Sequence, residues 1–194
     1  MTMSEATAPA GAPPATEPDA MYRAIERDVW AWIAEFVTVP NEFYNDKFPP
    51  CPYAKQAVLS KTVDVAVWRS GDVRPFIRER AVGMRDDPKL TTRVMAFPPR
   101  IQWEWGINDY VESLNAELIR DNVFLNTGVA KTSTSRYPGS NGKPYFIVVA
   151  NSLAAVLSGS ESLKRTEYYR DWPKSHYEIV VERRARMAKI YGGK

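Results

Sequence analysis

The sequence predicts a single α+β domain in which a small mixed sheet of about four strands is covered by amphipathic helices. Segments with alternating apolar residues are interspersed with longer segments whose apolar residues recur at helical spacing. A chain of 194 residues, 44% of them hydrophobic, has the size of one domain with a substantial core. Residues 1–19 are rich in Ala, Pro and Thr, so we expect a disordered tail there and one globular domain over 20–194.

The domain begins with helical patterns and then changes to an alternating one. Apolar residues recur at helical spacing over residues 21–36 and predict a first helix with a broad aromatic stripe. Pro52 suits the first turn of a short helix that ends near Leu59, because its missing N–H would have no partner there. Residues 61–70 alternate Val63, Val65 and Val67 with other side chains, and this pattern predicts a strand.

A second helix and a second strand follow. Residues 74–86 fit a helix that opens at Pro75 and ends before Asp87-Pro88, and residues 91–97 fit a strand. A strand, a helix and a strand in this order indicate a parallel pair joined by a right-handed crossover.

The next segments predict a helix and a β-hairpin. Residues 103–121 form a strongly amphipathic pattern that is typical of a helix packed on a core. Residues 123–131 and 144–152 predict two strands, and their connector contains Asn141-Gly142, a pair that tolerates positive φ. We therefore expect an antiparallel hairpin.

Two helices are predicted at the end of the chain. Residues 158–162, SGSES, are interpreted as a polar loop, followed by a short helix over 161–169. A longer helix is expected over 176–191, where Gly192-Gly193 stops it.

Composition excludes several classes of site. Cys51 is the only cysteine and His176 the only histidine, which rules out an intrachain disulfide and zinc sites built from several thiolates. Mononuclear non-haem iron, which commonly takes two histidines, is disfavoured. The sequence has neither an apolar run long enough to span a membrane nor a signal-peptide pattern, so we expect a cytoplasmic protein without a membrane partner.

The charge distribution favours small anionic partners. The formal net charge is +3, and the first twenty residues carry three acidic residues and no basic one, which leaves the rest of the chain at about +6. A basic body attracts phosphates, cofactor propionates or nucleic acid. Because basic and acidic residues alternate along most predicted helices, the pattern disfavours a nucleic-acid partner.

Cys51 is the first candidate functional residue. A thiol just before a helix that starts at Pro52 would be close to unpaired backbone N–H groups, which favour the thiolate form. A nucleophile or an axial haem ligand would be placed in this way. The alternative is a small buried hydrophobic residue covered by the neighbouring prolines and aromatic residues.

His176 is the second candidate. Ser175 could cap a helix there, and an imidazole in the first turn of a helix would be held neutral, the state that ligates iron or acts as a base. Tyr and Trp residues surround it in the sequence and suggest the wall of a pocket. The alternative is a surface histidine on the last helix.

Glu104 is the third candidate, because it lies between Trp103 and Trp105. A carboxyl group between aromatic walls can have a raised pKa and act as an acid or base. The alternative, which the pattern favours, is a solvent-facing glutamate between two core-facing rings. No phosphate-binding loop, dinucleotide fingerprint or nucleophile-elbow motif occurs in the chain.

The segment FPPCPYA (48–54) resembles the Pro-Cys-aromatic-Ala segment of bacterial proteins of the YqcI/YcgG type, some of which are haem-dependent N-oxygenases. The later order of features is similar, with a strand in PYFIVVAN and then Pro173 and His176 followed by arginines. The resemblance implies that His176 is the metal ligand of a haem. It also implies further haem-binding residues, which are Arg170, Arg183, Arg184, Trp172 and Tyr177.

Three hypotheses follow. The leading one is a haem-binding, oxygenase-like enzyme that acts on a small nitrogenous or aromatic metabolite, with Cys51 and Glu104 as catalytic candidates. Iron in a porphyrin suits a chain with one His and one Cys, since the macrocycle supplies four ligands. The alternatives are a non-enzymatic module that binds a small ligand or a protein, and a thiol-dependent enzyme that uses Cys51. The sequence leaves homo-oligomerisation open.

Overall fold

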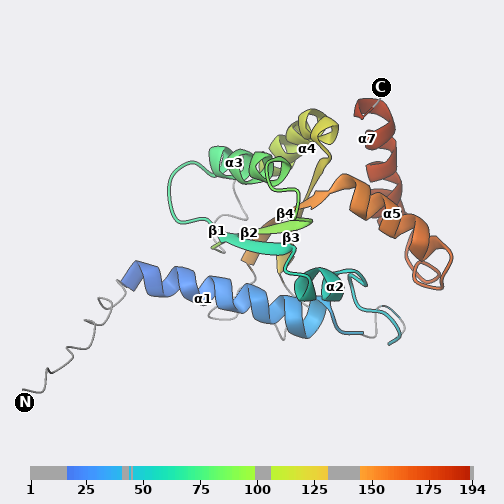
Figure 1. The fold of residues 1–194 in the computed structure, drawn as a ribbon, viewed down its shortest axis with the longest axis horizontal. Coiled ribbons are helices and arrows are strands. Elements are labelled where there is room, and N and C mark those ends of the chain that lie inside the picture. The colour runs from blue at the N-terminus through green and yellow to red at the C-terminus, as the bar shows by residue number, and fades with distance from the viewer. Residues whose placement is uncertain (1–16, 41–43, 45, 99–105, 131–144, 193–194) are drawn as a thin grey trace, which may run out of the picture.

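The computed structural model describes residues 17–40, 44, 46–98, 106–130 and 145–192. It confirms the predicted α+β class: a four-stranded mixed sheet carries helices on both faces (Figure 1). Among the described residues, none of the helices combines the length and the apolar composition that crossing a lipid bilayer requires.

The strands of the sheet lie in the order β1-β2-β4-β3. They are β1 (Val63–Val67), β2 (Thr92–Phe97), β3 (Val123–Ala130) and β4 (Tyr145–Ser152). The pair β1–β2 is parallel, and β4 pairs antiparallel with both β2 and β3. Both the predicted parallel pair and the predicted antiparallel pair are therefore confirmed. The Asn141-Gly142 connector lies outside the described residues.

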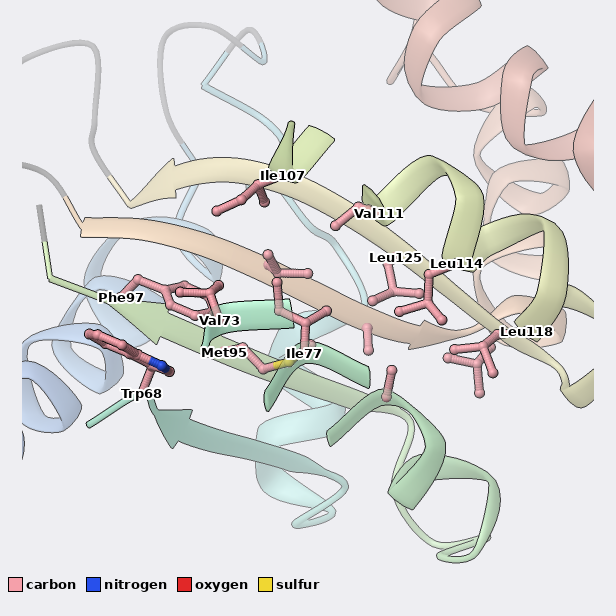
Figure 2. Close-up of a cluster of buried hydrophobic side chains, with 14 of the residues drawn as sticks. Trp68, Val73, Ile77, Met95, Phe97, Ile107, Val111, Leu114, Leu118 and Leu125 are labelled. Carbon is pink, nitrogen blue, oxygen red and sulfur yellow. The ribbon is translucent and has the colours of Figure 1, made fainter. Parts of the chain in front are cut away.

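One face of the sheet is covered by α3 (Val73–Arg85) and α4 (Ile107–Leu118), and η4 (Ile119–Asp121) follows α4. The side chain of Asp72 accepts a hydrogen bond from the backbone N–H of Arg74 and caps α3. Helix and strand residues meet in the continuous apolar cluster of Figure 2. We call this side of the sheet the packed face.

The opposite face is covered by α1 (Glu17–Trp32), the π-helical segment η1 (Ile33–Val37) and the short helix α2 (Ala54–Leu59) (Figure 1). Ile25 and Val29 of α1 are buried against apolar strand residues of this face. The helical spacing of the apolar residues in α1 predicted this contact.

The C-terminal elements lie beyond one end of the sheet in Figure 1. They are α5 (Leu153–Lys164), α6 (Lys174–Tyr177), the π-helical segment η6 (Glu178–Glu182) and α7 (Arg183–Tyr191). A separate apolar cluster joins them to the sheet, and it is made by Ile119, Phe124, Leu153 and Met187.

The predicted loop at 158–162 is wrong, and the predicted helix at 161–169 is correct only over residues 161–164. α5 begins directly after β4, where the Ser152 side chain accepts a hydrogen bond from the N–H of Ala155, and it ends at Lys164. Gly159 and Ser160 have little helix propensity, but both are buried against neighbouring elements. Tertiary packing therefore overrides local preference in this segment.

Candidate functional site

A cavity of about 640 Å³ lies against the sheet face that α1 and α2 cover. The alternation of β4 locates it, since Tyr145 and Ile147 belong to the α1 cluster and Leu153 to the C-terminal cluster. Val149 and Asn151, which lie between them on the same face, line the cavity. The cavity therefore occupies the gap between two apolar clusters, and we call this side of the sheet the hollow face.

The floor of the cavity is the sheet itself and carries polar side chains where a packed sheet would carry apolar ones. Asn126 pairs with Val149, and Thr92 pairs with Asn151. The Thr92 hydroxyl donates a hydrogen bond of 3.1 Å to Asn151 Oδ1. The Asn126 side chain has no hydrogen-bond partner within the described part of the chain, so it is free to bind a ligand.

The walls are predominantly apolar and come from helices that are distant in sequence. Apolar wall residues are contributed by α1, η1, α2 and α5, and they are Trp32, Ile33, Val37, Ala57, Val58, Ala155 and Val156. Single π-turns within helices are frequent at functional sites, and η1 supplies two of these residues. The backbone N–H of Cys51 donates to Val37 O at 3.1 Å and joins the segment before α2 to this wall.

Arg184, at the start of α7, is the charged residue of the lining. Only 8% of it is exposed, and its Nη2 donates a hydrogen bond of 2.8 Å to Ser160 Oγ. Among the residues that the structure describes, its buried Nε–H has no acceptor and none of the carboxylates lies within 4.0 Å of the guanidinium. Burial lowers the pKa of Arg184 from its ordinary value, but an arginine remains a cation near neutral pH.

Trp32, at the end of α1, is a second lining residue with an unpartnered donor. Its indole Nε1–H is buried and has no acceptor among the described residues. Indole N–H groups in protein interiors usually have an acceptor. Two residues of the cavity lining therefore each carry a buried N–H group without an acceptor among the described residues.

Cys51 lines the cavity, but its chemistry differs from the prediction. Cys51 is exposed, and it lies three residues before α2, which starts at Ala54 and not at Pro52. Burial raises the pKa of the thiol, and this effect outweighs the backbone N–H groups of Tyr53 and Ala54 and the charge of Arg184, all of which lower it. The pKa of Cys51 is therefore raised and not lowered, which favours the neutral thiol over the thiolate.

Contacts to the C-terminal region hold the segment that presents Cys51. The Tyr168 hydroxyl donates to Pro50 O at 2.6 Å, and the Tyr53 hydroxyl donates to Gly159 O at 3.0 Å. A Cβ added at Gly159 would lie 2.8 Å from the Tyr53 ring, so only glycine allows this approach. The cavity wall therefore depends on the α5 segment that the sequence analysis assigned to a loop.

His176 is exposed in α6, which begins after Pro173 without a side-chain cap from Ser175. Its ring packs on Trp172, with 4.5 Å between the centroids, and Tyr177 packs on Tyr169. The predicted aromatic surroundings exist, but His176, Trp172 and Tyr177 do not line the cavity.

The three arginines that the resemblance implies for haem binding have different surroundings. Arg170 pairs with Glu167 at 2.8 Å, and Arg183 pairs with Glu112 of α4. Arg184 alone lines the cavity. The described residues thus do not gather His176 and these cations around one space, which does not fit a haem there. Haem binding stays a prediction.

Two further predictions concern metals and Glu104. Within the described ranges, no group of three or more His, Cys, Asp or Glu side chains could hold a metal ion. Glu104 lies outside the described residues. No family model, no curated protein and no solved structure gives a significant match to this chain.

Sequence reasoning placed Cys51 and Arg184 among the candidates but missed Trp32, Asn126 and Asn151. The signal for the two asparagines was present, since both fall at alternating positions of predicted strands where a core would require apolar residues. Their meeting on one face depends on the register of the predicted pair of β3 with β4, which the strand patterns do not specify.

Proposed function

We propose that this protein binds one small, largely apolar molecule in the cavity on the hollow face. This is the small-ligand alternative of the sequence analysis. The observation that carries it is the cavity of about 640 Å³, whose mostly apolar walls enclose a few polar groups without partners. Ligand sites in proteins have this size and this combination of surfaces.

The physical argument rests on the cost of leaving the cavity as it is. The cavity is partly open to solvent, so its mostly apolar lining is in contact with water, which is unfavourable. The buried N–H groups of two lining residues, Trp32 and Arg184, have no acceptor among the described residues and add a further cost. A ligand that fills the apolar volume and supplies acceptors removes both costs, and its binding therefore stabilises the fold.

The proposal is tested with N-phenyl-1-naphthylamine, a neutral probe that fluoresces in apolar surroundings. We expect saturable binding to one site in the wild-type protein. Ala57→Phe places a ring in the cavity from α2 and should weaken binding about tenfold or more, because the volume is taken. The matched control is Ala154→Phe, which adds the same ring at an exposed residue of α5 that does not line the cavity.

The outcomes separate the hypotheses. Equal binding by Ala57→Phe and Ala154→Phe would place the probe elsewhere on the surface and refute the proposal. The haem prediction is tested by titrating hemin into the wild type, Ala57→Phe, Ala154→Phe and His176→Ala. A Soret shift that His176→Ala abolishes and Ala57→Phe leaves unchanged would assign haem to a site other than this cavity.

A further inference from the structure

We propose that the cavity ligand carries a carboxylate, which pairs with Arg184 while the apolar part of the molecule fills the space over the sheet. This inference rests on the proposed function and specifies its ligand class as monocarboxylic acids with an apolar body. Its two supports are the buried guanidinium and the two buried N–H groups, of Arg184 and Trp32, that have no acceptor among the described residues.

The first support is a cation without a counter-ion. Transferring a guanidinium into the protein interior is expensive unless an anion and hydrogen-bond acceptors compensate. Arg184 is more than nine-tenths buried, and its side chain is hydrogen-bonded to the neutral Ser160 hydroxyl only, as far as the described residues go. Its Nε–H is buried and unpaired within the described part of the chain, and Arg184 lines the cavity. A carboxylate is the group that arginine binds best.

The titratable groups around Arg184 do not supply that anion. Cys51 and Tyr169 are the groups whose charges couple to the guanidinium. Burial raises the pKa of both, so both are neutral near pH 7. Within the described ranges, the positive charge at the cavity therefore has no counter-ion at physiological pH.

The second support is the kind of groups left without partners. Arg184 Nε and Trp32 Nε1 are both donors, and a donor can be satisfied only by an acceptor. They are supplied by opposite ends of the chain, yet both residues line the same cavity. A carboxylate has two oxygens that accept hydrogen bonds and no donor when ionised, which matches this character.

The neighbouring Arg183 shows how an arginine of this helix is placed when it has a counter-ion. Arg183 pairs with Glu112 and stacks over the ring of Phe124, with 5.9 Å from its Cζ to the ring centroid. Two consecutive residues of α7 thus differ in their counter-ion. Arg183 pairs with a carboxylate of the protein, whereas Arg184 lines a cavity. This pair provides a matched control.

The test compares 2-naphthoate with 2-naphthalenemethanol, which share the ring system and differ in the charged group. We expect the wild-type protein to bind the acid about tenfold to a hundredfold more tightly than the alcohol, the range for a hydrogen bond to a charged group. Arg184→Met should abolish this preference and leave alcohol binding unchanged. Arg183→Met should retain it. Isothermal titration calorimetry measures all six dissociation constants.

Folding is monitored separately, because loss of binding could reflect unfolding. Arg184→Met removes an unpaired buried charge and keeps the length of the side chain, so its melting temperature should equal or exceed that of the wild type. Equal affinity of the wild type for acid and alcohol would overturn this inference and leave the proposed function standing. If the wild type binds none of the three compounds, the acid, the alcohol and the neutral naphthylamine probe, then this inference and the proposed function are both overturned.

Discussion

The two faces of the sheet are built from the same four strands but are filled differently. On the packed face, strand residues such as Met95 and Val148 meet α3 and α4 in a continuous apolar cluster (Figure 2). On the hollow face, Thr92, Asn126 and Asn151 occupy the corresponding alternating positions and border a cavity. Consecutive residues of one strand therefore serve stability on one side and a candidate binding site on the other.

This difference assigns stability and binding to separate residues. Substitutions on the packed face should reduce the free energy of unfolding, because close packing leaves no room to relax. Substitutions on the hollow face should change ligand binding at a smaller cost in stability. The predictions below test that division, starting with the largest expected effect.

Asn115 is the buried polar side chain of the packed side, and its loss should be the most costly. Its Nδ2 donates to Leu125 O at 3.0 Å, and its Oδ1 accepts from Leu125 N–H at 2.7 Å. Asn115→Ala leaves both backbone groups buried without partners, which should cost roughly 2–4 kcal/mol. Urea unfolding measures it. Ser113→Ala, at an exposed position of the same helix, should change stability by less than about 0.5 kcal/mol.

Val148 and Val149 compare the two faces directly. Val148 is fully buried on the packed face, and Val149 borders the cavity. Val148→Ala should cost roughly 2–3 kcal/mol, and Val149→Ala about 1 kcal/mol, because the second site is already incompletely packed. Equal losses in urea unfolding would contradict the division of the two faces.

Gly159 should show a smaller effect with a defined local cause. Its alanine variant brings a Cβ against the Tyr53 ring, and overpacking outweighs the gain in helix propensity by about 1 kcal/mol. The measurement is the melting temperature of Gly159→Ala. Ser158→Ala, at the exposed preceding position, serves as the control and should leave that temperature unchanged or slightly raise it. A stabilised Gly159→Ala protein would show that Tyr53 moves freely.

Cys51 should react slowly with iodoacetamide in the folded protein. Burial raises its pKa, so less thiolate is present near pH 7 than in the unfolded chain, and the rate should increase as the pH rises above the ordinary thiol pKa of about 8.5. The same thiol in denaturant is the control, since the chain has one cysteine. Faster labelling of the folded protein would restore the hypothesis of an activated nucleophile.

The periodicity of the sequence predicted the strands and most helices because burial on one side imposes a repeat of two or of about 3.6 residues. It failed at α5, where Gly159 and Ser160 resemble loop residues but are held in a helix by contacts with Tyr53 and Arg184. Cys51 and His176 became candidates mainly because each is the single residue of its type in the sequence. The cavity instead depends on the register of the strands and the placement of the helices, which bring Trp32 and Asn126 to the same cavity only in the folded protein.

The most direct test of the central claim is a crystal structure of the protein with 2-naphthoate. We predict that the naphthalene ring lies over Val94 and Val149 and that a carboxylate oxygen lies about 2.7–2.9 Å from a nitrogen of the Arg184 guanidinium. An empty cavity in crystals that hold the acid elsewhere, or a carboxylate directed to solvent with Arg184 still unpaired, would contradict the account.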